Sequence, residues 1–368
     1  MKKILCCMAV ALACLNVRAQ VISFNDKEVK VMRELIRDDD SPSFKKVFTP
    51  FERTAQSAMT EAPNPIDEIR SQGLLEGNPQ KTASLNSVKD AYKIYALALE
   101  YQYSKTRKYL KKATGYLLAW AHTNHASGDP INETKLEDMF TAYDLIRRDI
   151  AKTDRDSIDR WMKSIADAEV NSKSAQPGRG TAINNWNSHR IKIITLIAYT
   201  LHDSSYYALV NTLMEKQLEI NLNADGTTHD LMERDAFHYH TYDIEPLLSA
   251  AIAIYRASGK NYFTYQTSKG ASLKKSVDYM IPFMTGEKIH PEFVKSTVPF
   301  DKKRAQNNEK GYAAGTLFKP EGGLYTFSLA AFFDPAYLNV IHKASKQGDA
   351  YFNWQLAQNR IREIAAGK

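Results

Sequence analysis

SLNSVKDAYKIYALALEYQYSKTRKYLKKATGYLLAWAHTN, residues 84–124, has the spacing of helices rather than of strands. Its apolar residues recur every three or four positions, which places them on one face of a helix. The spacing predicts one helix over roughly residues 88–103 and a second over roughly residues 105–122. Two amphipathic helices joined by so short a connection are expected to pack as an antiparallel hairpin.

The same spacing continues along most of the chain. Helical segments follow at 135–150, 155–174, 187–203, 204–222, 240–258 and 272–284, with glycine-, proline- or asparagine-containing breaks between them. Strand signals are few, and GGLYTFSLAAFF at 322–333 is readable as a short strand or as a helix start. The repeated pattern predicts an all-α fold, an (α/α) toroid or incomplete barrel of antiparallel helix hairpins with little β. A helical solenoid is the alternative.

The N-terminus has the pattern of a secretory signal peptide. A basic start, MKK, precedes the short apolar run ILCCMAVALACL, which is too short to cross a bilayer, and a cut after Ala19 fits the small residues there. Residues 1–19 are therefore expected to be removed, and residues 20–368 to form one domain without a transmembrane segment. The protein is expected to be secreted across the inner membrane into the periplasm. A lipid anchor at Cys14 is the less favoured alternative.

Removal of the signal peptide changes the chemistry that the chain can offer. All three cysteines lie within it, so the mature chain has no thiol for a disulfide, a metal or a nucleophile. Three basic residues and no acid are lost, which lowers the formal net charge from +7 to +4. A modestly basic secreted protein suits an acidic partner such as a polyanionic glycan, although a merely solvated surface has the same composition.

Two segments combine residue types that ordinary helices do not need. The first, GRGTAINNWNSHRIKI at 178–193, places three asparagines, a tryptophan, a histidine and an arginine before an apolar helix. One asparagine is enough to cap a helix, so the others are candidates for a site. If the helix starts near Asn184, Asn185 and His189 share one face, and Trp186 and Arg190 share the next.

The second segment is DGTTHDLMERDAFHYHTYDIEPLL at 225–248. A turn at Asp225 is followed by residues that we expect to form a helix from about residue 231. On such a helix Arg234 and His238 would share a face, and Tyr239 would lie close to Arg234. A buried tyrosine flanked by satisfied histidines is the structural alternative for the HYH triplet.

Several reaction classes lack their usual signature. The sequence has no H-E-x-x-H zinc motif, no G-x-S-x-G nucleophile elbow, no phosphate-binding glycine loop and no basic–aromatic pattern for nucleic acid. It requires neither a metal nor a cofactor. A glycoside hydrolase needs paired carboxylates, and this alternative stays open because four acids are available for it: Glu137, Asp144, Glu233 and Asp235.

β-Elimination of a uronate polymer uses the residue types that are present. The C5 proton beside the sugar carboxylate is weakly acidic, so amides and cations must hold that carboxylate while the proton leaves. Asn185 and Arg234 suit this role. A base must take the proton and an acid must protonate the leaving oxygen, and a tyrosine can do either when nearby cations favour its phenolate. Clustering of Arg234, His238 and His240 around Tyr239 would serve that purpose.

These motifs resemble those of the alginate lyase superfamily of (α/α)-toroid polysaccharide lyases. The matching elements, over about residues 85–260, are Asn184-Asn185, Asp225-Gly226, Arg234, Tyr239-His240 and Pro246-Leu247. The resemblance implies that Asn185 and Arg234 neutralise the carboxylate and that Tyr239 is the acid. It leaves open whether Tyr239 is also the base.

One position departs from the family pattern. Trp186 stands where the family has a histidine directly after the asparagine pair. His189, one helical turn after Asn185, is expected to fill the vacated role, with His238 or His240 as alternatives.

A third segment, EKIHPEFVKSTVPFDKKRAQ at 287–306, contributes basic residues that would line a groove for an acidic sugar chain or lie in a solvated loop. The expected catalytic residues are thus Tyr239, His189, Asn185 and Arg234. The expected substrate-binding residues are Asn184, Trp186, Asn187, Arg190, His238, His240, Tyr242, His290, Lys302 and Arg304.

The sequence therefore predicts a secreted lyase for an acidic polysaccharide, with mannuronate-rich alginate as the substrate that the resemblance implies. Other polyuronates (glucuronan or heparosan), a glycoside hydrolase on the same toroid, and a non-catalytic acidic-glycan binding protein remain alternatives. The oligomeric state and the preference for chain ends or chain interiors stay open.

Overall fold

The computed structural model describes residues 20–367. The expected signal peptide and the alternative anchor at Cys14 lie outside the described residues. The hairpin predicted from residues 84–124 is present as α4 (Lys89–Ser104) and α5 (Arg107–Thr123). Lys105 ends α4 in the left-handed conformation at φ 58°, which turns the chain back toward α5.

The other predicted helices are present in the predicted order, and further helices lie before, between and after them. They are α1 (Asp26–Arg37), α2 (Pro42–Ala58), α3 (Pro79–Ser87), α6 (Pro130–Glu133), α7 (Glu137–Ile146), α8 (Lys152–Val170), α9 (Asn185–Leu201), α10 (Tyr207–Asn221), α11 (His229–Arg234), α12 (Phe237–Ser258), α13 (Leu273–Met284), α14 (Pro299–Gln306), α15 (Leu324–Ala330), α16 (Tyr337–Ala344) and α17 (Trp354–Ala365). The segment 322–333 is largely helical, as α15. The described residues form no named strand, and their β pairing is limited to two isolated bridges, Leu222 with Thr228 and Pro291 with Leu317.

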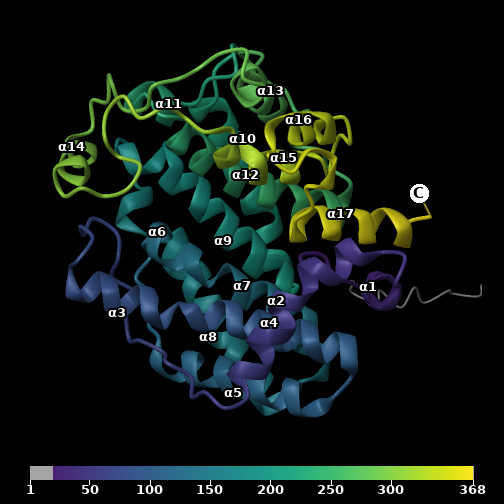
Figure 1. The fold of residues 1–368 in the computed structure, drawn as a ribbon. Helices are drawn as coiled ribbons and strands as arrows, with labels where there is room; N and C mark the ends of the chain where they lie inside the picture. The colour runs from purple at the N-terminus through teal and green to yellow at the C-terminus, as the bar shows by residue number, and fades with distance from the viewer. Residues whose placement is uncertain (1–19, 368) are drawn as a thin grey trace, which may run out of the picture.

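The helices form a closed ring (Figure 1). Around it, α4 packs on α7, α7 on α9, α9 on α12, and α12 on α15. Helix α15 then contacts α17, and α17 packs against α1 and α2, which return to α4. Helices α5, α8 and α10 pack on the outside of α4 and α9. The toroid prediction is confirmed, and the solenoid alternative is wrong because the first helix contacts the last.

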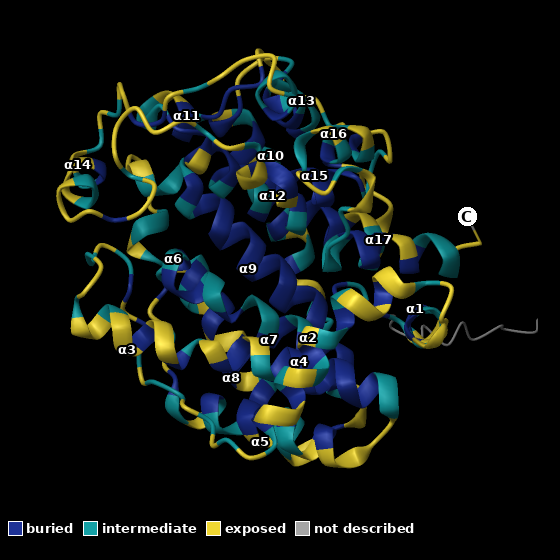
Figure 2. Cartoon of the chain, viewed as in Figure 1, coloured by how far each residue is buried: buried dark blue, intermediate teal, exposed yellow. Residues whose placement is uncertain are grey.

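Burial separates the inner helices from the outer ones (Figure 2). Almost every residue of α9 from Asn185 to Thr200 is buried, whereas α8 buries one face only. One continuous hydrophobic cluster extends from Ile22 to Ile361 and joins the inner helices to both chain ends. Within residues 20–367, no helix combines the length and the apolar character that crossing a bilayer requires.

The helix expected to continue from about residue 231 is interrupted. Helix α11 ends at Arg234, Asp235 adopts the left-handed conformation at φ 51°, and α12 begins at Phe237. Segment 292–297 stabilises the break, because Phe293 N–H donates to the Asp235 carbonyl (2.7 Å) and Lys295 N–H to its carboxylate (2.8 Å). The expected shared helix face of Arg234 and His238 is therefore wrong, and Tyr239 lies in the first turn of a new helix.

Candidate active site

A cleft of about 310 Å³ opens where α9 and α12 begin. The segments before and within α3, around α6, and in and after α14 form its walls, and Figure 1 shows these elements on one side of the ring. Seven of the residues predicted from the sequence line it: Asn185, Trp186, Arg234, His238, Tyr239, Tyr242 and Arg304. The fold thus brings together the two segments that the sequence singled out and part of the third.

The cleft is lined by cations and by no acid. Lys81, Lys135, Arg234 and Arg304 face it, and no described lining residue carries a carboxylate. The acids lie behind the cations. Asp301, which is 2% exposed, pairs with Arg234 at 3.1 Å. The cations that face the cleft attract an anionic ligand, and the acids behind them hold these cations in place.

Tyr239 lies between two of these cations. Arg304 donates a hydrogen bond from Nη1 to the Tyr239 hydroxyl at 2.8 Å, and the Arg234 guanidinium stacks on the Tyr239 ring, 3.6 Å from its centre. Its ring is 6% exposed and packs with Ala236 and Phe293. The phenolic oxygen therefore has a fixed position beside a guanidinium and can accept a proton there.

Asn185 begins α9 and is held by an acid from α11. Its backbone N–H donates to Asp230 at 2.8 Å, and its side-chain amide nitrogen also donates to that carboxylate. Burial raises the pKa of Asp230 to about 6, while the hydrogen bonds from Asn185 oppose that rise. Because Asp230 takes one N–H of the amide, the orientation of the Asn185 side chain is fixed, and the second N–H is left to donate to a ligand.

His238 is the histidine that reaches the cleft. Its Nε2 lies 3.3 Å from the hydroxyl of Tyr312, and its ring meets the Tyr239 ring edge-on with centres 4.9 Å apart. Desolvation against the cleft wall, and then the charges of Arg304 and Arg234, lower the pKa of His238 to about 4, although the residue as a whole is exposed. At neutral pH His238 is uncharged and acts through hydrogen bonds.

His189 lies beneath the cleft. Its ring packs on Tyr242 with centres 4.3 Å apart, and Nδ1 forms a hydrogen bond with the Thr134 hydroxyl at 2.9 Å. Nε2 is buried without a hydrogen-bond partner among the described residues. Burial, and then the charges of Lys192 and Lys135, hold the pKa of His189 well below its usual range. His189 is therefore neutral and supports Tyr242, and it does not line the cleft.

The other predicted binding residues do not line the cleft. Asn184 caps α9 by accepting from Trp186 N–H (3.1 Å), and Lys302 is exposed on α14. Four further side chains are engaged within the protein, Asn187 with Gln217, Arg190 with Glu169, His240 with Thr228 and Ser276, and His290 with the Asp235 carbonyl.

The carboxylates weighed for a glycoside hydrolase also lie elsewhere. Asp144 is 2% exposed and accepts hydrogen bonds from Ser23. Asp235 stabilises the break between α11 and α12. Glu233 lies two positions earlier, where its backbone carbonyl accepts from Thr297 N–H. Glu137 lines a different cavity. None of these acids faces another across the cleft.

Among the cleft residues that the sequence analysis did not predict, three carry a charged or phenolic group: Lys81, Lys135 and Tyr312. Burial, and then repulsion by Lys81 and Lys192, lower the pKa of Lys135 to about 8. Lys135 begins the segment that precedes the asparagine motif, so its position was a usable signal. Lys81 and Tyr312 come from segments without any distinctive pattern.

The comparisons with known proteins agree with this geometry. A sequence model of the alginate lyase family matches residues 40–290. The chain belongs to the alginate lyase family. It is a polysaccharide lyase with the (α/α) toroid fold. A comparison with curated protein sequences gives no match.

Solved alginate lyases share the fold. An alginate lyase from Bacteroides ovatus superposes with a TM-score of 0.67 and 18% identity, over 94% of this chain and 98% of that chain. Alginate lyase A1-III from Sphingomonas species A1 gives a TM-score of 0.54 at 18% identity, over 83% of this chain and 95% of that one. An A1-III variant complexed with a tetrasaccharide gives 0.56 at 18% identity, over 86% and 89%.

Proposed function

We propose that this lyase cleaves mannuronate-rich alginate by β-elimination, with Tyr239 as the proton-transferring residue. The observation that carries the proposal is a tyrosine hydroxyl that Arg304 hydrogen-bonds, in a cleft that four cations line and whose described lining holds no acid. A hydrolase would need a carboxylate there, whereas an elimination needs charge neutralisation and a proton acceptor.

In the proposed reaction the cleft binds the uronate carboxylate first. Arg234 and the Asn185 amide hold its negative charge. Tyr239, as phenolate, takes the proton from C5, and the electron pair forms the C4–C5 double bond as the C4–O bond breaks. The proton on Tyr239 then passes to the leaving oxygen, so the enzyme ends in its starting state. Arg304 stabilises the charge that the Tyr239 oxygen carries before it takes the proton.

Three further cleft residues, His238, Lys81 and Lys135, assist this step in the proposal. His238 is uncharged at neutral pH and hydrogen-bonds Tyr312, so it positions the donors around the reacting oxygen rather than supplying charge. Lys81 and Lys135 bind carboxylates of neighbouring sugar units. The tetrasaccharide in an A1-III variant of this fold supports a chain of several units as substrate.

The test is the ultraviolet absorbance of the unsaturated uronate that elimination creates. Alginate, glucuronan and heparosan are incubated separately with the wild type, with Tyr239→Phe and with Tyr255→Phe. Tyr255 lies on the same helix, is 39% exposed and packs on Phe332 and Phe333, so it is a matched control. We expect the absorbance to rise fastest with alginate and Tyr239→Phe to lose at least about 100-fold in kcat.

Other outcomes point elsewhere. New reducing ends without absorbance would make the protein a hydrolase, and a full rate in Tyr239→Phe would remove Tyr239 from proton transfer. A faster rise with glucuronan or heparosan would keep the elimination and change the substrate.

We also propose that the chain is exported and cut after Ala19. In the structure Gln20 is buried, and its side-chain amide donates to the carbonyls of Asp144 (2.8 Å) and Leu145 (3.0 Å). A chain starting at Gln20 would keep these bonds, which supports the cut. N-terminal sequencing of protein from the periplasmic fraction should begin at Gln20, and a start at Cys14 would indicate the lipid anchor instead.

A further inference from the structure

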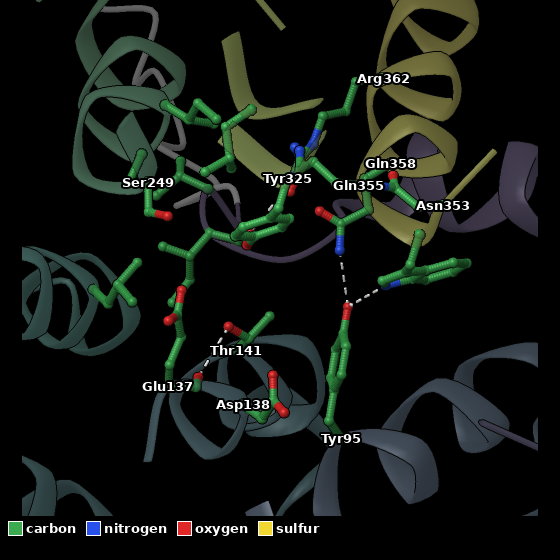
Figure 3. A pocket seen from close by; sticks show the side chains of 17 residues that line it. Tyr95, Glu137, Asp138, Thr141, Ser249, Tyr325, Asn353, Gln355, Gln358 and Arg362 are labelled. Carbon is green, nitrogen blue, oxygen red and sulfur yellow. Dashed lines mark hydrogen bonds between the residues drawn. The ribbon is translucent and has the colours of Figure 1, made fainter. Parts of the chain in front are cut away.

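A second cavity, of about 330 Å³, lies apart from the cleft (Figure 3). Its walls come from α4, α7, α9, α12, α15, α17 and the segment before α1. Leu196 on α9 lines it, roughly 16 Å along the helix from Asn185 at about 1.5 Å per residue. The two hollows share no lining residue. The volume is in the range of pockets that hold one or two sugar rings.

One end of this cavity carries a buried cation with no acidic partner. Arg362 on α17 is 9% exposed, and among residues 20–367 it forms no ion pair. Its one hydrogen bond is from Nη2 to the Ile22 carbonyl at 3.4 Å, and Nε has no partner. The rings of Phe24 (5.9 Å) and Phe332 (5.8 Å) and the charge of Glu28, which is itself paired with Arg256, only partly compensate this buried guanidinium. An anion bound beside it would offset the remaining cost of burying the charge.

Tyr95 adds a second donor on this side. Its hydroxyl oxygen accepts hydrogen bonds from Trp354 Nε1 at 3.0 Å and from Gln358 Nε2 at 3.2 Å, as the dashed lines in Figure 3 show. With both lone pairs used, the hydroxyl proton remains to be donated. Burial raises the pKa of Tyr95, so it keeps that proton.

The opposite end offers acceptors. Figure 3 shows Glu137 and Asp138 entering from α7 at the end away from Arg362. One Glu137 oxygen pairs with Lys192, which leaves the other for a ligand. Burial, and then the charge of Glu137, raise the pKa of Asp138 to about 6. In either protonation state Asp138 can hydrogen-bond a sugar hydroxyl.

The side wall between the two ends is aromatic. Tyr325 on α15 lines the cavity and is 45% exposed, which is high for so large an apolar ring. Its face is free to pack on a sugar ring, and its hydroxyl can bond either end of a ligand. The site therefore has a cation at one end, acids at the other and a ring in between.

We propose that this cavity is a second ligand site, which binds a small hydroxylated carboxylate of one or two sugar rings. The carboxylate lies toward Arg362 and the Tyr95 hydroxyl, and the hydroxyl groups lie toward Asp138 and Glu137. Two sources share this chemistry: an unsaturated uronate released by the cleft and a free sugar acid. The site stands on its own geometry and does not depend on the proposed reaction.

Tryptophan fluorescence gives a direct test, because Trp354 lines this cavity and Trp186 lines the cleft. The Trp186→Phe protein is titrated with mannuronate, glucuronate, an unsaturated uronate disaccharide and the neutral methyl mannoside. We expect a saturable change with the acids and binding at least about tenfold weaker for the neutral sugar. The acid that binds most tightly shows whether the ligand of the cavity is an unsaturated uronate from the cleft or a free sugar acid.

Variants of the cavity decide whether the signal comes from it. Arg362→Gln, in the Trp186→Phe background, should weaken sugar-acid binding at least about tenfold. If circular dichroism shows that Arg362→Gln is not folded, Tyr325→Ala replaces a half-exposed side chain and should weaken binding several-fold. Unchanged affinity in a folded cavity variant, or no saturable change with any acid, overturns the proposal.

The cleft and the second cavity are separable in the same experiment. Tyr239→Phe should lose lyase activity, and in the Trp186→Phe background it should retain the sugar-acid binding measured by fluorescence. If the wild type shows no lyase activity but binds sugar acids, the proposed function is wrong and the second ligand site is supported. If the wild type shows lyase activity but binds no sugar acid in the cavity, the proposed function is supported and the second ligand site is wrong.

Discussion

Arg234 and Arg304 approach Tyr239 from different directions and from different parts of the chain. Arg234 comes from the end of α11 and covers the ring, whereas Arg304 comes from α14 and bonds the hydroxyl. Arg234 was predictable because it lies near Tyr239 in sequence. Arg304 was recognised only as part of a basic segment, since 65 positions separate it from Tyr239 and only the fold brings the two together.

Lys135 makes the cleft sensitive to alkaline pH. With its pKa lowered to about 8, it carries a charge below that pH and loses it above, unlike an ordinary lysine. We therefore expect KM for alginate to rise several-fold between pH 7 and pH 9.5 with a smaller change in kcat. Lys135→Arg should flatten this rise because a guanidinium stays charged.

The measurement is initial rates of absorbance change across that pH range. Lys274→Arg, at a 42% exposed lysine on α13 outside the cleft, is the control and should keep the wild-type profile. The same alkaline rise in wild type and Lys135→Arg would contradict the role of Lys135.

At the scale of elements, helical spacing was a good guide wherever a helix depends on its own residues. The predicted helices at 88–103 and 105–122 agree with α4 and α5 to within about two residues. The break at Asp235 was missed because its stabilising partners, Phe293 and Lys295, lie about sixty positions further along the chain. Local spacing contains no information about such partners.

The start of α12 depends on a carboxylate from another segment. Its N-cap residue, Ala236, has no capping side chain, and Glu292 accepts instead from the N–H groups of Phe237 (2.8 Å) and His238 (3.0 Å). Glu292→Gln keeps one acceptor oxygen and turns an amide nitrogen toward the other N–H. It should destabilise the protein by about 1 kcal/mol, the usual size of a lost cap, and lower kcat several-fold because Tyr239 is in that first turn.

Thermal unfolding and lyase rates measure the two effects of Glu292→Gln. Glu287→Gln, at a 64% exposed carboxylate five residues earlier, should change neither. A stable Glu292→Gln protein with the wild-type rate would mean that α12 begins correctly without this cap.

The whole molecule is a ring whose ends meet, and this links its stability to α17. Ile361 on α17 is fully buried in the continuous core. Ile361→Ala should cost about 2–5 kcal/mol, the usual range for such a truncation. Because the ring is closed, circular dichroism and lyase activity should be lost together on heating. Arg360→Ala, at a 52% exposed neighbour, is the control and should leave the thermal unfolding transition at the wild-type temperature. If circular dichroism and lyase activity of Ile361→Ala were lost at different temperatures, α17 would unfold alone.

Closure by α17 also determines when the protein can finish folding. Helix α1 packs on α17, so one of the earliest segments made by the ribosome waits for one of the last. Contacts between such distant positions slow folding, because a long loop must close before they form. The nascent chain therefore leaves the exit tunnel with α1 able to pack on α2 and α4 but not yet on α17. A chaperone that shields the face of residues 26–37 meant for α17 until that helix is available would raise the yield of active enzyme.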